Sequence, residues 1–345
     1  MTRRTVSVAA ISLALLAVLL LSGLAGKLDL TAGLSFLGTE EVQAFKAMFI
    51  SLFLEAFPYL LLGAFVSSIL QVLVKDEWIQ RVIPRGPIGG MAAGSLLGLL
   101  LPICECGMVP VVRRLLRKGM PLHAGVAFLL AGPIVNPVVW SATWAAFRLY
   151  PAMVYARMGL ALLVAFTISG LVYRFVRSNP LREAADDHEP LLAQGSSHAW
   201  RAGREQRARG GKLASILDHT ANELVDTGKY LVLGIAVTAW IQATIPRAWL
   251  MDAGQEGWAT YGMMLGLAYV SSLCSTSDAF VAASFAGVFP AGALLTFLVA
   301  GPMLDFKTTL LLLSGFRARF VLLLAGAVAV TVTGGAMLWA HWVFP

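Results

Sequence analysis

Apolar residues of this chain gather into long runs that are separated by short polar stretches. The runs are residues 5–25, 43–74, 88–112, 122–147, 152–175, 220–245, 258–288, 291–315 and 320–343. A helix needs about 20 residues to cross the hydrocarbon core of a bilayer, and the runs reach or exceed that length. They are rich in Leu, Ala, Val and Gly and lack the short alternation of an outer-membrane barrel. The pattern therefore predicts an all-α polytopic membrane protein.

Composition supports this class, because 58% hydrophobic and 13% charged residues are far from the balance of a soluble fold. The first apolar run follows Arg3 and Arg4 and loosely resembles a signal peptide. We expect an N-terminal transmembrane helix instead, because the run is long and no clear cleavage site follows it. No phosphate-binding loop motif is present, so we do not expect ATP-driven transport by this chain.

Charged residues concentrate in residues 176–218, which hold seven Lys or Arg and six acidic residues. This stretch is predicted to be a basic cytoplasmic linker, since positive loops face the cytoplasm. It divides the chain into an N-terminal helix and outer loop (1–42), a first transmembrane repeat (43–175) and a second one (219–345). The positive-inside rule explains the net charge of +7 without nucleic acid, which is not an expected partner.

The two halves on either side of the linker resemble each other. Tyr59 and Tyr230 lie 171 residues apart in matching segments, and Cys106 and Cys274 lie 168 apart. The sequence "AGP" recurs at 131–133 and 300–302, an offset of 169. Matching blocks in the same order predict an internal duplication, as in many transporters.

Charge then predicts the orientation of the two repeats. Basic residues flank the first cysteine segment on both sides: Lys75, Arg81 and Arg85 before it, and Arg113, Arg114, Arg117 and Lys118 after it. Both flanks are expected in the cytoplasm, so residues 88–118 are predicted to form a re-entrant hairpin. The equivalent flanks of the second half lack this charge. We therefore expect two inverted repeats, each with a re-entrant broken-helix hairpin. The competing topology has nine plain spans, and a reporter fusion that places residue 115 outside would favour it.

All three cysteines lie in the matching turns of the two halves, Cys104 and Cys106 in "LPICECGMVP" and Cys274 in "SSLCSTSD". On a regular helix, residues two apart point about 200° apart and could not share a ligand. An unwound turn removes this obstacle, and we expect three residues to break the helix: Pro102, Gly107 and Pro110. Three thiols near the membrane midplane would suit a soft metal or metalloid. The alternative is that each cysteine is a small buried apolar side chain.

Other polar residues in the apolar runs are candidates for the same site, because ionisable groups inside a membrane commonly mark transport pathways. Those predicted to bind substrate with the cysteines are Glu105, Asn136, Ser275, Ser277, Asp278 and Asp305. Those predicted to couple protons are the equivalent pair Glu55 and Asp226. Two structural alternatives stay open: Asp305 can pair with Lys307, and Asn136 can satisfy backbone groups freed by Pro137.

A family resemblance is carried by residues 102–147, "PICECGMVPVVRRLLRKGMPLHAGVAFLLAGPIVNPVVWSATWAAF". This segment resembles the predicted permeases that include the arsenical (ArsP-type) efflux permeases, and the likeness extends loosely from about residue 44 to the C-terminus. It implies a bacterial inner-membrane permease whose arsenical-exporting relatives hold trivalent organoarsenicals through thiols. Glu105 stands where that pattern has a serine. A carboxylate between two thiols suits a divalent metal such as zinc better than a neutral organoarsenical.

The resulting hypothesis is a secondary transporter that exports a soft metal or metalloid by alternating access, with Cys104, Cys106 and Cys274 as ligands. It is not expected to be an enzyme or to need a cofactor. Its expected partners are the substrate and membrane lipid; a soluble partner on the linker and a homo-oligomer stay open, as does a channel mechanism. A thiol redox carrier, which would form a Cys104–Cys106 disulfide, and a structural subunit of a membrane complex are the alternatives.

Overall fold

The computed structural model describes residues 40–73, 79, 83–84, 86–101, 103–176, 180–181, 212–244 and 257–343. The apolar run at 5–25 and most of the 176–218 linker lie outside these residues, so the N-terminal helix and the cytoplasmic linker stay predictions. Within the described residues all regular structure is helical apart from two isolated bridges. This confirms the all-α class.

Within the described residues, each half of the chain contributes six helices in the same order. The first half forms α2 (Glu40–Leu73), α4 (Pro87–Leu100), α5 (Glu105–Arg117), α6 (Leu122–Ala131), α7 (Pro137–Ala146) and α8 (Pro151–Phe175). The second forms α10 (Lys212–Thr244), α12 (Trp258–Ser271), α13 (Ser277–Ser284), α14 (Ala291–Met303), α15 (Phe306–Gly315) and α16 (Ala318–Val343). Helices α4 and α12 both begin and end 171 residues apart, and α7 and α15 do so 169 apart. Helix α10 starts at Lys212, inside the predicted linker, rather than at 219.

In the part of the chain that the structure describes, five helical stretches are long and apolar enough to cross a membrane, one of which combines α14 and α15. They are Val42–Leu73, Pro151–Phe175, Ile216–Ala243, Ala291–Gly315 and Ala318–His341. Four of the apolar runs, 88–112, 122–147, 258–288 and 291–315, are each divided into two helices. With 14 residues, α4 extends only about 21 Å, which is less than the thickness of the hydrocarbon core. The described residues therefore form a polytopic membrane protein with fewer plain spans than the nine-span alternative requires.

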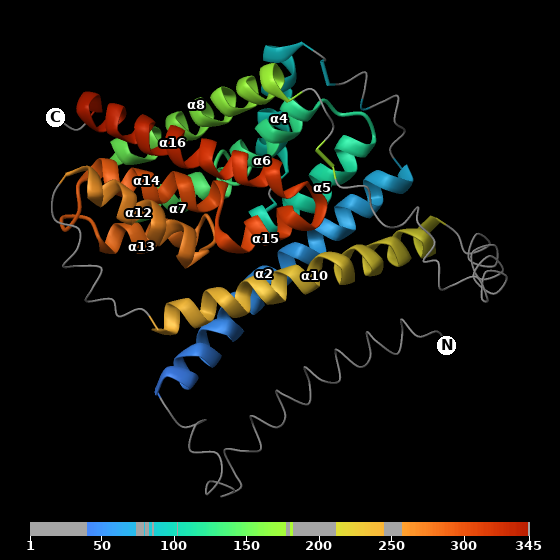
Figure 1. Cartoon of the computed structure of the whole chain (residues 1–345), viewed down its shortest axis with the longest axis horizontal. Coiled ribbons are helices and arrows are strands. Elements are labelled where there is room, and N and C mark those ends of the chain that lie inside the picture. The colour runs from blue at the N-terminus through green and yellow to red at the C-terminus, as the bar shows by residue number, and fades with distance from the viewer. Residues whose placement is uncertain are drawn as a thin grey trace, which may run out of the picture.

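Equivalent helices lie side by side in two places (Figure 1). Helices α2 and α10 pack together along one side of the molecule and run in opposite directions, and α8 and α16 do the same on the other side. Helices α6 and α14 form the centre, where α14 buries every residue from Gly292 to Met303. Opposite directions within these pairs are what an inverted duplication requires, but the inversion of the whole repeats stays a prediction.

Small residues allow the closest helix contacts, as is common inside membranes. A Cβ atom added to Gly63 of α2 would lie 2.4 Å from the Cα atom of Gly107 in α5. A Cβ on Gly98 of α4 would likewise lie 2.5 Å from the Cα atom of Gly132. The prediction that Gly107 and Pro110 break the helix is wrong, because α5 continues through both to Arg117. Gly107 is instead the point where the backbones of α2 and α5 meet. Pro102 lies outside the described residues.

Candidate functional site

The first cysteine turn lies between α4 and α5. Cys104 is the N-cap of α5 and has extended backbone angles (φ −71°, ψ 169°), whereas Cys106 belongs to the first helical turn. Because Cys104 precedes the helix, its side chain is not held 200° from that of Cys106. The two thiols interact electrostatically with each other, and both residues are buried. The break at this turn agrees with the prediction, although it ends at Cys104.

The second cysteine turn lies between α12 and α13. Ser272 ends α12 in the left-handed conformation (φ 45°, ψ 41°), and it is the only described non-glycine residue with a positive φ. Two residues later, Cys274 is buried and its sulfur accepts a hydrogen bond from the Thr276 hydroxyl at 3.8 Å. Cys274 interacts electrostatically with Cys104 and with Glu105 of the first turn. The two turns, and with them the three thiols, therefore occupy one region of the interior.

Lys307, in the first turn of α15, connects the two cysteine turns. Its Nζ atom lies 3.3 Å from Oε1 of Glu105, 3.6 Å from Oδ2 of Asp305 and 3.2 Å from the carbonyl oxygen of Ser272. The side chains of Lys307, Glu105 and Asp305 are 5%, 3% and 1% exposed. Glu105 Oε2 makes no hydrogen bond to any described residue. No three His, Cys, Asp or Glu side chains of the described residues are arranged to hold a metal ion in this conformation.

The equivalent residues Asn136 and Asp305 both serve as N-caps. The Asn136 side chain accepts a hydrogen bond from the Val138 N–H at 2.9 Å at the start of α7. The Asp305 side chain accepts one from the Thr308 N–H at the start of α15. A short polar acceptor before a helix satisfies backbone N–H groups that have no helical partner. The matching positions of these two residues therefore follow from matching helix starts, and only Asp305 also reaches Lys307.

Asp278 of α13 takes part in a second buried network, which is centred on Arg157 of α8. Nη2 of Arg157 donates to both Asp278 carboxylate oxygens, at 2.8 and 2.9 Å, and to the Ser275 carbonyl oxygen at 3.0 Å. Nη1 donates to the Thr143 hydroxyl of α7 at 2.8 Å. The Arg157 side chain is 0% exposed. This network ties the backbone of the second cysteine turn to α7 and α8.

The predicted proton-coupling pair has unequal surroundings. Glu55 of α2 accepts a hydrogen bond from the Ser277 hydroxyl at 3.0 Å, next to the second cysteine turn. Asp226 of α10 pairs with Lys229 at 3.8 Å, and both side chains are about two-thirds exposed, 66% and 62%. Equivalent positions in the sequence thus give Glu55 a place at the site and Asp226 a place on an exposed helix face.

A match to the sequence profile of a family described as "predicted permease" extends over residues 41–340. The chain belongs to this predicted permease family. The match covers every described helix apart from the first residue of α2 and the last three of α16. It agrees with the resemblance carried by the first cysteine turn and the Asn136 helix break.

Two curated relatives of this permease match most of its length, and a third matches less than half. The UPF0718 protein YcgR of Bacillus subtilis (strain 168) is 39% identical over 309 residues, which are 90% of this chain and 99% of that protein. A putative two-component membrane permease complex subunit of Streptococcus mutans is 33% identical over 280 residues, 81% of this chain and 89% of that protein. The UPF0718 protein YraQ of Escherichia coli (strain K12) is 27% identical over 143 residues, 41% of each chain. No solved structure matches the permease.

The predictions from sequence assign no role to Arg157 and include only one of the contacts of Lys307. Arg157 is an ionisable residue inside the apolar run 152–175, and that position alone was a usable signal. Lys307 was considered only as a partner of its neighbour Asp305. Its contact with Glu105, 202 residues away, could not be read from local sequence.

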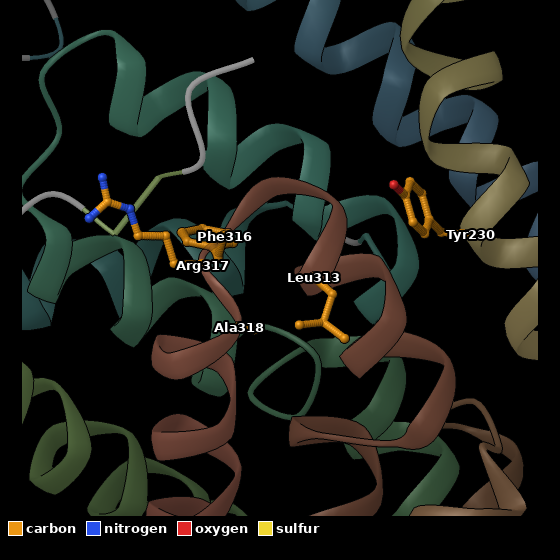
Figure 2. Close-up of a pocket in the computed structure, with 5 residues that line it drawn as sticks. All are labelled: Tyr230, Leu313, Phe316, Arg317 and Ala318. Carbon is orange, nitrogen blue, oxygen red and sulfur yellow. The ribbon is translucent and has the colours of Figure 1, made fainter. Parts of the chain in front are cut away.

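The permease also has a surface hollow of about 400 Å³ between α10 and the turn from α15 to α16 (Figure 2). Its lining residues are Tyr230, Leu313, Phe316, Arg317 and Ala318. None of the predicted site residues lines it, so the hollow is separate from the thiol region.

Proposed function

We propose that this permease is a secondary transporter of the bacterial inner membrane that exports a soft metal ion or a trivalent metalloid by alternating access. In this proposal Cys104, Cys106 and Cys274 supply sulfur ligands, and Glu105 supplies a carboxylate. The N-terminus and the 176–218 linker face the cytoplasm, as their charge predicts.

One observation carries the proposal: the chain's three cysteines lie in or directly beside the two equivalent helix breaks, are buried, and interact electrostatically with one another or with Glu105. Sulfur ligands favour soft cations such as Cu⁺, Zn²⁺ and trivalent arsenic, and a carboxylate favours the charged members of this group. Because the described side chains form no finished metal site, the ligands would close around the cargo during transport. Glu55, through Ser277, is the coupling residue that we favour over Asp226.

Transport by purified protein in liposomes tests the proposal, with Zn²⁺, Cu⁺ and a trivalent organoarsenical as separate cargoes. Cys106→Ser and Cys274→Ser are each expected to lower transport of one cargo about tenfold or more, because even groups that merely support metal ligands commonly change affinity by that factor. Ser284→Ala is the matched control, since the Ser284 hydroxyl is exposed and bonds only within α13. Wild-type transport by both cysteine variants would eliminate the thiol site.

The second candidate function is that of one subunit in a two-component permease complex. The observation that favours it is that the Streptococcus mutans relative is described as a putative two-component membrane permease complex subunit. Reconstitution distinguishes the two, because a chain that needs a second component would be inactive alone and active only when both proteins share the liposome. A thiol redox carrier predicts instead a reversible Cys104–Cys106 disulfide, which mass spectrometry of the isolated protein would reveal.

A further inference from the structure

The buried acidic groups of the thiol region need a positive charge to balance them. Glu105 and Asp305 would place two negative charges in the interior, where an unpaired charge is very costly. Among the described residues, Lys307 supplies the one positive charge that contacts both of them. In the conformation described here, a cation therefore already stands at the site, and it belongs to the protein.

The Lys307 ammonium also has the contacts that a bound cation would have. It touches a carboxylate of the first cysteine turn, a backbone carbonyl of the second and a second carboxylate from its own helix. It interacts electrostatically with Cys104, Cys106 and Cys274 as well. Oxygen atoms from both halves of the chain thus contact it, and the three thiols interact with it electrostatically.

Part of the donor capacity around the ammonium is unused. Oε2 of Glu105 and Oδ2 of Asp305 are buried and make no hydrogen bond within the described structure; Oδ2 is only in ion-pair range of Lys307. Buried carboxylate oxygens are normally satisfied. Their state suits a site that takes up a further cation.

We propose that Lys307 is a tethered cation that fills the site when cargo is absent, and that a cationic cargo binds the two cysteine turns by displacing its ammonium. This inference rests on the proposed transport of a soft cation by the same site. Two cations a few ångströms apart in a low-dielectric interior repel strongly, so ammonium and cargo exclude each other. A neutral cargo would not need to displace Lys307.

Displacement would also release the second cysteine turn. The Lys307 ammonium donates to the Ser272 carbonyl oxygen at 3.2 Å, and the Lys307 backbone N–H donates to the Ser272 hydroxyl at 3.5 Å. Ser272 is held in the left-handed conformation, which is unfavourable for a residue with a Cβ atom. Movement of the ammonium would remove one of the contacts that maintain this turn, and so link cargo binding to backbone change.

Binding measurements on purified full-length protein test the inference. Zn²⁺ affinity would be measured calorimetrically for wild type, Lys307→Gln, Lys307→Met and Lys307→Arg, with Lys229→Gln as control because Lys229 is exposed on α10. Loss of the competing charge is expected to tighten Zn²⁺ binding about tenfold or more in the Gln and Met variants. Arg, which keeps the charge, and the Lys229 control are expected to stay near wild type. Affinity for a neutral trivalent organoarsenical, measured in parallel, should not improve in any variant.

Unchanged or weaker Zn²⁺ binding by both neutral variants would overturn the inference, provided that the wild type binds Zn²⁺ and the Cys106→Ser variant does not. Absence of cysteine-dependent binding in the wild type would instead remove the proposed function. Improved binding of the neutral organoarsenical would indicate a loosened site rather than a lost competitor, and it would also overturn the inference.

A measurement on the wild type avoids any dependence on the folding of the variants. A small amine reagent, followed by peptide mass spectrometry, is expected to modify Lys307 several-fold faster with saturating Zn²⁺ than without it. Lys229 serves as the internal reference. Equal protection of Lys307 in both conditions would contradict displacement.

Discussion

Replacement of Asp278 by Asn is expected to destabilise the fold strongly, because it leaves the Arg157 guanidinium buried without its counter-ion. Arg157 is 0% and Asp278 4% exposed, and their closest atoms are 2.8 Å apart. Removing one member of such a pair costs about 3–5 kcal/mol. The Thr143 hydroxyl and the Ser275 carbonyl still accept from the guanidinium, so the lower end of this range applies.

Thermal unfolding of the detergent-solubilised protein measures this loss. Each kcal/mol corresponds to about 2 °C in a chain of this size, so Asp278→Asn should unfold about 6 °C below wild type. Asp226→Asn is the matched control, because its partner Lys229 is 3.8 Å away and both side chains are exposed. Exposed pairs contribute little, and the control should stay within about 2 °C of wild type.

A double variant separates the lost ion pair from general damage. Arg157→Met combined with Asp278→Leu removes both charges, and it is expected to recover a large part of the stability that either single change loses. The reasoning would be refuted by a double variant whose loss equals the sum of the two single losses. A shift for Asp278→Asn no larger than that of Asp226→Asn would refute it as well.

Two further changes probe helix contacts. Gly107→Ala should lower the free energy of unfolding by about 1–3 kcal/mol, since its new Cβ would lie 2.6 Å from the Tyr59 carbonyl oxygen. Gly170→Ala is the control in the same unfolding assay: its Cβ would have no atom within 4 Å, so the free energy of unfolding should stay the same or rise by up to about 1 kcal/mol. Glu223→Gln should lower the free energy of unfolding by about 1 kcal/mol, because it weakens the 3.0 Å ion pair with Arg114. High salt should reduce this loss of stability, and a loss that stays the same in high salt would contradict an electrostatic origin.

Much of the architecture was predictable because lipid imposes simple rules. The length of the apolar runs indicated an all-α membrane protein, and the helix start at Glu105 lies where the cysteine turn predicted a break. The near-constant offset between the halves anticipated the paired helices α4 and α12. These features depend on local composition and on comparison of the chain with itself, so no tertiary contact had to be known.

The site was harder to predict because its decisive contacts join distant residues. Arg157 meets Asp278 across 121 positions, and no local pattern indicates that pairing. Helix propensity predicts that Gly107 breaks the helix. In the structure Gly107 lies within α5, where the lack of a side chain allows close contact with α2. Substrate binding by Asn136 stays a prediction, and its side-chain oxygen also accepts a hydrogen bond at the start of α7, a role that its position before Pro137 left open. A polar residue in an apolar run is therefore recognisable as important from the sequence, but its contacts and its role are not.

The contact between Gly63 and Gly107 has a mechanical consequence. A Cβ atom on either glycine would overlap the other's backbone or its surroundings, so α2 and α5 touch with no side chain between them that could change rotamer. Packed backbones of this kind slide or separate only as whole elements. We therefore expect a rearrangement that alters access to the first cysteine turn to move α2 and α5 together as one rigid unit. Relative movement would then occur at the contacts of these two helices with their other neighbours, α6, α10 and α15.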